Sequence, residues 1–170
     1  ATIAIESLPY RRTAMKHPRR DVWGMLRVGP RAPSVASIPA RLATIEPLVP
    51  PGPIQPTRSV RLGARMTLHG HDWLINDEQH HHDAPVKVGE LQVWDLVNET
   101  GMDHPFHLHG HTYQVVQPNG LGPRKDTVLV PPKQTVEVDF DTDNPGRWIV
   151  HCHNDYHLDG GMATFFEYTG

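Results

Sequence analysis

From Thr57 onward, short runs of Val, Ile, Leu and aromatic residues alternate with clusters of Gly, Pro, Asn and Asp. Runs of this kind predict β-strands bounded by turns. We expect eight strands: Ser59–Leu62, Trp73–Asn76, Leu91–Asn98, Thr112–Gln117, Thr127–Val130, Thr135–Phe140, Arg147–His151 and Ala163–Tyr168. Polar and apolar residues alternate in the sixth run, so Val136, Val138 and Phe140 are expected to face a core. No segment has helical periodicity. The pattern predicts an all-β protein, a Greek-key sandwich or barrel of roughly 110 residues.

The first 56 residues lack this pattern beyond a strand-like run at residues 2–5. A basic segment follows from Arg11 to Arg20, and eight of the 17 prolines lie between Pro30 and Pro56. Proline at this density predicts an extended connector rather than a helix. We therefore divide the chain into a basic, proline-rich N-terminal extension, residues 1–56, and a β-domain, residues 57–170.

Charge divides near the same boundary. Residues 1–43 hold eight Lys or Arg and two Asp or Glu, whereas residues 44–170 hold eight and 17. A basic arm of this kind is either a solvated segment or one that wraps an acidic surface, on its own globule or on a partner. Charge patterning alone does not decide between the two.

Composition narrows the classes of function. The 170 residues support one core of ordinary size. A net charge of -3 argues against nucleic-acid binding as the main role, and the lack of a long apolar run argues against a membrane span. A single Cys excludes an internal disulfide and a multi-Cys zinc module. Against that one Cys stand 13 His, and one thiolate among imidazoles suits copper better than zinc.

Two short segments gather most of the candidate ligands. They are H-P-F-H-L-H-G-H, residues 104–111, and H-C-H-N-D-Y-H-L-D-G-G-M, residues 151–162. In a strand, successive side chains point to opposite faces, so His151 and His153 share one face and Cys152 points to the other. By the same rule, residues 107 and 109 share a face, and residue 104 has the opposite parity. Pro105 weakens this last step, because a strand can be entered irregularly at proline.

If the two segments lie side by side, two metal sites follow. One face holds a trigonal set with a weak axial thioether, the ligand set of blue-copper electron-transfer sites: His104, Cys152, His157 and Met162. The other face holds four imidazoles, which suit a copper cluster or a site shared across an interface: His107, His109, His151 and His153. Zinc at the first site is the alternative, but a trailing Met does not suit zinc. Because Cys152 and its sequence neighbours belong to different sites, a single backbone step would link them.

These residues resemble the two copper-binding motifs at the end of multicopper oxidases, the laccase-like enzymes, which read H-P-x-H-L-H and H-C-H-x3-H-x4-M. The stretches K-D-T-V at 125–128 and N-P-G-R-W at 144–148 are similar as well. The resemblance extends roughly over residues 57–170, the last cupredoxin domain of such an enzyme, and implies a cupredoxin-like fold. It also implies that residues 1–29 are closing strands of a preceding domain, followed by a linker.

The resemblance assigns roles to the candidate ligands. Those of the type 1 copper site are His104, Cys152, His157 and Met162. His107 matches a type 2 ligand, and the type 3 ligands are His109, His151 and His153. In the enzymes that the chain resembles, type 1 copper accepts electrons and the other coppers reduce dioxygen. The catalytic residues implied are therefore those that carry electrons between the sites: Cys152, His151 and His153.

One part of the family pattern is absent from this chain. The family's oxygen-reducing cluster takes further imidazoles from two H-x-H motifs in the first domain. His69-Gly70-His71 spells H-x-H, but it lies at the start of the β-domain and does not match that place. We therefore expect the missing ligands to come from the remaining oxidase domains or from another copy of the chain, with a trimer as the favoured homo-oligomer.

The function expected is that of a copper-dependent oxidoreductase of the laccase type, acting on a phenolic or other small reducing substrate and dioxygen. One alternative is a copper-binding electron-transfer module with no turnover of its own. Another is nitrite reduction with type 2 copper between subunits, which the H-C-H arrangement fits less well. The resemblance implies a secreted or periplasmic location. His111 is interpreted as a supporting or surface residue, and residues 80–82 as a polar loop able to bind copper adventitiously.

Overall fold

A computed structural model of the chain describes residues 1–7, 20–30, 37, 39–40, 44, 46–48, 55–117 and 120–169. The chain divides into two compact units, Ala1–Thr44 and Ile45–Gly170. The basic run from Arg11 to Arg19 and most of the proline-rich segment lie outside the described residues. Within the described ranges, no helix has the length and apolar character needed to cross a membrane.

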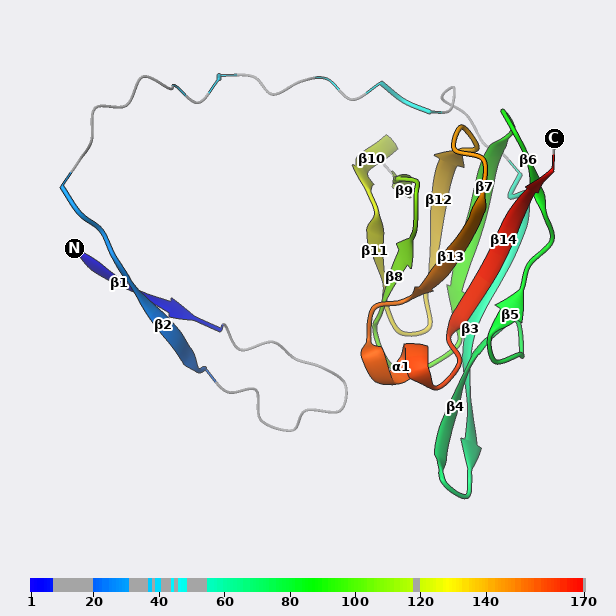
Figure 1. Ribbon diagram of the computed structural model, residues 1–170, viewed down its shortest axis with the longest axis horizontal. Coiled ribbons are helices and arrows are strands. Elements are labelled where there is room, and N and C mark those ends of the chain that lie inside the picture. The colour runs from blue at the N-terminus through cyan, green and yellow to red at the C-terminus, as the bar shows by residue number, and fades with distance from the viewer. Residues whose placement is uncertain are drawn as a thin grey trace. The chain divides into compact units, whose positions relative to one another are not determined.

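The first unit contains one antiparallel hairpin, formed by β1 (Thr2–Glu6) and β2 (Val22–Arg27) (Figure 1). β1 confirms the strand expected at residues 2–5; the residue pattern did not predict β2, although the resemblance implied strands within residues 1–29. The hairpin exposes large apolar side chains on both strands, and Trp23 is 77% exposed. A two-stranded ribbon with exposed apolar faces is marginally stable on its own.

The second unit is a sandwich of two sheets (Figure 1). The order of the first sheet is β10 (Gly120–Lys125), β9 (Tyr113–Gln117), β12 (Thr135–Asp141), β7 (Leu91–Asn98), β3 (Arg58–Thr67) and β4 (Gly70–Ile75). The order of the second is β11 (Thr127–Val130), β8 (His104–Leu108), β13 (Arg147–Cys152), β14 (Ala163–Thr169) and β5 (His81–His82), while β6 (Val86–Lys87) also pairs with β14. Most pairs are antiparallel, but β3–β7, β14–β5 and β14–β6 are parallel. The all-β, cupredoxin-like sandwich predicted from the sequence is confirmed.

The core lies between the two sheets and is built from alternate residues of each strand. Val138 and Phe140 of β12 are fully buried, as the alternation predicted, and Val136 packs against the core from its edge. Trp94 of β7 meets Phe140 edge-on, with ring centroids 4.9 Å apart, and Phe166 of β14 reaches it from the opposite sheet. Burial of these large side chains is the main stabilising contribution to the sandwich.

All eight predicted strands are present, and the elements missed are short or atypical. The prediction did not place strands at β5, β6 and β10, and it did not delimit β8 within the first histidine motif. It also excluded helices, whereas α1 (Asp155–Asp159) forms one turn and a half. Five residues are too few for helical periodicity to show in a sequence.

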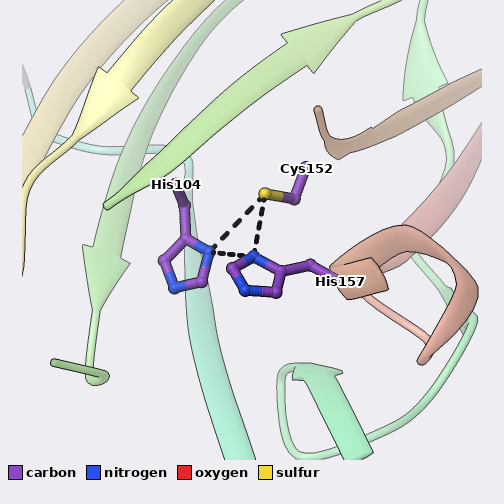
Figure 2. A group of neighbouring side chains, drawn as sticks. All are labelled: His104, Cys152 and His157. Atoms are coloured by element: carbon purple, nitrogen blue, oxygen red, sulfur yellow. Dashed lines mark hydrogen bonds between the residues drawn. The ribbon is translucent and has the colours of Figure 1, made fainter. Parts of the chain in front are cut away.

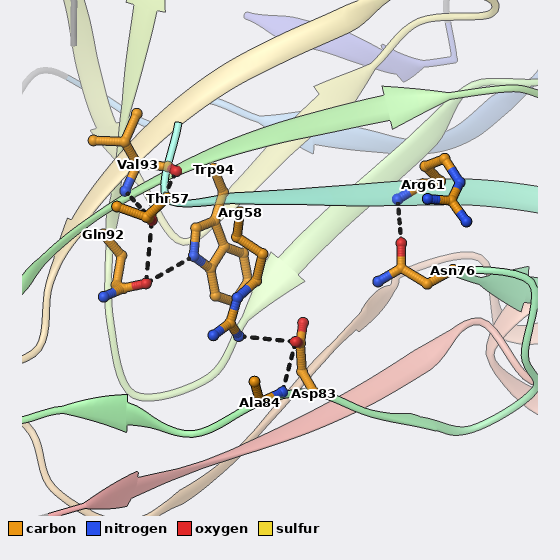
Figure 3. Close-up of polar contacts among 9 residues, drawn as sticks. All are labelled: Thr57, Arg58, Arg61, Asn76, Asp83, Ala84, Gln92, Val93 and Trp94. Carbon is orange, nitrogen blue, oxygen red and sulfur yellow. Dashed lines mark hydrogen bonds and ion pairs between the residues drawn. The ribbon is translucent and has the colours of Figure 1, made fainter. Parts of the chain in front are cut away.

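A cluster of polar contacts links the start of β3 to β7 (Figure 3). The Thr57 hydroxyl donates to the Val93 carbonyl at 2.9 Å and accepts from the Val93 N–H at 3.1 Å. The Arg58 guanidinium lies 5.0 Å from the centroid of the Trp94 ring and pairs with Asp83 at 3.1 Å. These contacts fix the parallel β3–β7 pairing, and the β3–β4 hairpin extends from it toward the end of the sandwich that carries α1 (Figure 1).

Candidate metal centre

Strands β8 and β13 bring the two histidine motifs together. They pair antiparallel with His151 opposite His107 and Cys152 opposite Phe106. Two backbone bonds prolong the pairing beyond the strands: His153 N–H donates to the Pro105 carbonyl at 2.7 Å, and residue 109 N–H donates to the Ile149 carbonyl at 3.1 Å. Pro105 lies in a regular strand, since it needs only its carbonyl there. The motifs therefore lie side by side, which meets the condition for two separate sites.

On the core side of this pair, three side chains converge (Figure 2). His104 Nδ1 lies 3.1 Å from His157 Nδ1, and the Cys152 Sγ atom lies 3.3 Å from His157 Nδ1 and 3.6 Å from His104 Nδ1. All three residues are fully buried. Three donor atoms pointing at one another in the interior form a trigonal group able to hold a metal ion.

The loop after β13 carries His157, the third member of the trigonal group, and Met162. α1 carries His157, and the Met162 N–H donates to the His157 carbonyl at 2.9 Å. The Cys152 N–H donates to the Met162 carbonyl at 3.1 Å, which ties the end of the loop back to β13. Gly161 has φ = 115°, a conformation that glycine adopts without strain. Met162 is fully buried beside the trigonal group, and its axial role remains a prediction.

The remote ring nitrogens of the two imidazoles differ in their partners. His104 Nε2 lies 2.7 Å from the Thr100 hydroxyl, which itself donates to Asn98 Oδ1 at 2.8 Å. His104 therefore carries its proton on Nε2 and turns the Nδ1 lone pair toward Cys152. His157 Nε2 is buried and has no hydrogen-bond partner among the described residues. Sequence reasoning missed Thr100, because a threonine four residues before a ligand carries no motif.

Burial sets the protonation states in this group. Desolvation and the neighbouring His157 lower the pKa of His104 to about 3, and desolvation lowers the pKa of His157 to about 4. Burial raises the pKa of Cys152 to about 11, against a smaller opposing effect of the Asn154 backbone N–H. The interior thus disfavours imidazolium and free thiolate alike. A bound cation would reverse the second effect, because it stabilises the thiolate directly.

On the outer side of the same pair lie the four other predicted histidines. The ligand nitrogens of three of them lie within 4.8 Å of one another: His107, His151 and His153. His109 joins them through its Nε2 atom, which is 3.1 Å from His151 Nε2. His151 is 8% exposed, and His153 is exposed. All four lie on one face, as the strand parity predicted.

Backbone carbonyls orient two of these rings. His107 Nδ1–H donates to the Asp126 carbonyl at 2.8 Å, and His151 Nδ1–H donates to the Cys152 carbonyl at 3.0 Å. Each ring therefore presents Nε2 to the shared space. Desolvation and the surrounding imidazoles lower the pKa of His109, and desolvation lowers the pKa of His151. Neutral imidazoles with their lone pairs directed at one space suit a metal cluster.

The remaining histidines of interest lie apart from both groups. His69 and His71 lie at the turn of the β3–β4 hairpin, where both are exposed. His81 Nδ1 lies 3.0 Å from Glu78 Oε2 in the loop that contains β5. Neither set joins a group of metal-ligand atoms in the described part of the chain.

A family model described as multicopper oxidase matches residues 50–169. The chain belongs to the multicopper oxidase family. It is 43% identical over 117 residues to multicopper oxidase MmcO of Mycobacterium tuberculosis. The aligned region covers 67% of this chain and 23% of that protein. It is 46% identical over 78 residues to Laccase-5 of Trametes versicolor, covering 41% of this chain and 15% of that one. The solved structure of McoA multicopper oxidase from Aquifex aeolicus matches 99% of this chain with a TM-score of 0.76 and 26% identity, over 41% of its own length.

Membership in this family implies copper as the cofactor, and the residues present fit it. The buried trigonal group offers one thiolate and two imidazoles, ligands that copper prefers, with their donor atoms already directed at one point. The outer group offers imidazoles alone. This multicopper oxidase chain spans less than half the length of each of these relatives.

Proposed function

We propose that this chain is the C-terminal, copper-binding part of a laccase-like multicopper oxidase. In this proposal, electrons from a small reducing substrate enter at the group formed by His104, Cys152 and His157, and dioxygen is reduced beside the four-histidine group. The observation that carries the proposal is the alternation along β13. Cys152 belongs to the buried group, while its sequence neighbours His151 and His153 belong to the outer group. The two groups are therefore one residue apart along the chain.

The residues of this chain determine the ligands, the solvent access and the protonation at the buried site. Copper bound at these sites would supply the one-electron redox chemistry. The core around His104, Cys152 and His157 excludes water, and these three residues together with the buried Met162 would hold the type 1 copper in the proposal. Thr100 fixes the proton of His104 on Nε2, so its ring can ligate only through Nδ1.

The four-histidine group would be completed from outside this β-domain. Its imidazoles are partly exposed and come from a single face, which supports a site shared with other oxidase domains or with a second copy of the chain. For residues 1–56 we propose the tail of a preceding domain and a linker. The exposed apolar side chains of the β1–β2 hairpin support this, because such a ribbon needs a partner to cover it. If a homo-oligomer completes the site, we favour a trimer.

The reducing substrate in this proposal is a phenol or a comparable small reductant, and the second substrate is dioxygen. The family relationship also supports a location outside the cytoplasm, secreted or periplasmic. Cell fractionation of the native host, followed by detection of the chain, tests the location independently of the chemistry.

Copper content and oxygen uptake test the proposed function. Assembled with the domains or copies that complete the four-histidine group, the copper-loaded protein should show the blue thiolate-to-copper absorption, hold two or more copper ions per chain and consume oxygen with a phenol. Cys152→Ser should remove the blue absorption and the oxygen uptake while metal bound at the four-histidine group survives. One copper per chain with no uptake would instead support an electron-transfer module. Blue absorption retained in Cys152→Ser would overturn the assignment.

A further inference from the structure

His109 lies in the turn after β8, and both of its backbone polar groups are hydrogen-bonded. The His109 N–H donates to the Ile149 carbonyl at 3.1 Å, and the His109 carbonyl accepts from His111 Nδ1 at 2.9 Å. The next carbonyl, that of Gly110, accepts from the Asn144 side-chain amide at 2.9 Å. Two of these three bonds come from side chains, those of His111 and Asn144.

His111 is held in turn by the last strand. A carbonyl can only accept, so the bond to His109 places the His111 proton on Nδ1. The neutral ring then accepts at Nε2, where the Tyr168 hydroxyl of β14 donates at 2.6 Å. The two rings are nearly parallel, with planes 8° apart, and His111 is only 9% exposed. The imidazole therefore bridges the His109 backbone to β14.

A second bridge runs through the segment before β13. Gly110 has φ = 72°, and a Cβ atom there would lie 2.7 Å from the Trp148 ring. The Trp148 indole N–H donates to the Asn144 carbonyl at 2.8 Å, so the residue that holds the turn is itself fixed. The ring of Trp148 also lies edge-on to His111 at 5.7 Å.

We propose that His111, Tyr168 and Asn144 are positioning residues that hold the imidazole of His109 in the four-histidine group. This inference rests on the proposed function, because it assigns them to a site that the proposal fills with copper. None of the three has a ligand atom in either group of candidate metal ligands. Their effect is exerted through the backbone on both sides of His109.

The need for such support follows from the position of His109. His107 and His151 have a ring nitrogen hydrogen-bonded to a backbone carbonyl, whereas no such bond to His109 exists among the described residues. Its orientation thus depends on the turn that carries it. Ligand groups must be held to within about 0.5 Å for a metal site to form well. Loss of an outer partner of a metal ligand weakens metal affinity by about 10- to 100-fold.

Zinc binding to the four-histidine group tests the proposal. In a Cys152→Ser background, which disables the buried group, zinc affinity is measured by titration calorimetry for the parent, Tyr168→Phe and Asn144→Asp. Tyr168→Phe keeps the ring and removes only the hydroxyl. We expect weakening of up to about 10-fold in both variants, because each acts on His109 through the backbone and not on its ring. Tyr113→Phe is the matched control, since the Tyr113 hydroxyl is buried without a partner in the described part of the chain. Zinc affinity unchanged in Tyr168→Phe would overturn the proposal.

Imidazole spectra of the metal-free full chain separate this inference from the proposed function. Long-range proton–nitrogen correlation should show His111 as the Nδ1–H tautomer and a single ordered ring environment for His109. In Tyr168→Phe, the His109 signal should broaden or shift, while that of His107 stays. An Nε2–H tautomer at His111, or an unchanged His109 signal in the variant, overturns the positioning role. If the spectra behave as expected but the oxidase assembled with its remaining domains or copies binds no copper at the four-histidine group, the proposed function fails and the positioning role stands.

Discussion

The indole ring of Trp73 lies against the imidazole of His157, with ring centroids 3.7 Å apart and planes tilted by 37°. Trp73 belongs to β4, and its backbone N–H donates to the Gly160 carbonyl at 3.0 Å, in the loop that leads from α1 to Met162. Tyr156 covers the same imidazole from the solvent side, with centroids 4.2 Å apart. One tryptophan from a distant hairpin thus closes the loop that carries two of the four predicted type 1 ligands.

Trp73→Ala should lower the free energy of unfolding of the metal-free chain by about 3–5 kcal/mol, because it removes a large side chain that is 7% exposed. It should also weaken copper retention at the buried group, since His157 loses the surface that holds its ring. Urea unfolding and the blue absorption after dialysis measure the two effects. Trp23→Ala is the control, because that side chain is 77% exposed and should cost less than about 0.5 kcal/mol. Equal losses in both variants would contradict the role of Trp73.

The sequence predicted the parts of this architecture that depend on local pattern. Runs of Val, Ile and aromatic residues bounded by Gly, Pro, Asn and Asp located the eight strands, and strand parity separated Cys152 from His151 and His153 without knowledge of the fold. The same rule placed His104 on the inner face of β8, where it is fully buried. These inferences succeed because the direction of a side chain in a strand is set by the backbone alone.

The contacts that shape the sites depend on residues distant in sequence, and no local pattern reports them. Thr100 and Trp73 reach the buried group from a loop and from a hairpin, so only the assembled sandwich brings them there. His111 was interpreted as a supporting or surface residue, but its bond to Tyr168, 57 residues away, could not be foreseen. α1 was missed because its helical conformation covers only five residues.

Gly161→Ala should disrupt the loop that carries His157 and Met162. Residue 161 has φ = 115°, and a Cβ atom there would lie 2.6 Å from Gln79 Cβ. Strain and the clash together should destabilise the chain by about 1–3 kcal/mol and lower copper occupancy of the buried group. Thermal unfolding and absorption spectra measure both. Gly101→Ala, at a site with open space and no positive φ, should leave them unchanged; comparable losses there would show that the loop geometry is not the cause.

Asp139→Asn should stabilise the protein above pH of about 6. Burial, with a smaller effect of Glu137, raises the pKa of Asp139 to about 6, and the carboxyl is only 2% exposed. Between pH of about 4 and about 6, the folded chain keeps a proton that the unfolded chain has released, so rising pH favours unfolding. Above that window, ionisation of the buried carboxyl lowers the free energy of unfolding of the parent by about 1–3 kcal/mol, and the variant does not have this loss.

The free energy of unfolding as a function of pH, compared between the parent and Asp139→Asn, measures this effect. The two curves should coincide near pH 4 and differ by about 1–3 kcal/mol at pH 7. Asp141→Asn, an exposed carboxylate on the same strand, serves as the control and should follow the parent. Parallel curves for parent and Asp139→Asn would show that the Asp139 carboxyl does not bind its proton more tightly in the fold.

Metal uptake at the buried group should release about one proton per ion at pH 7, and the proton should come from Cys152. The pKa values of His104 and His157, about 3 and about 4, mean that both imidazoles are already neutral. The pKa of Cys152, about 11, means that the thiol must lose its proton to ligate. Cobalt(II) titrations of the chain and of Cys152→Ser, in buffers of different ionisation enthalpy, measure the difference. The difference between the two chains in protons released per ion should stay near one between pH of about 5 and about 10, because all three pKa values lie outside that range. No difference between the two chains would mean that the Cys152 thiol does not ligate the metal or is already ionised in the fold.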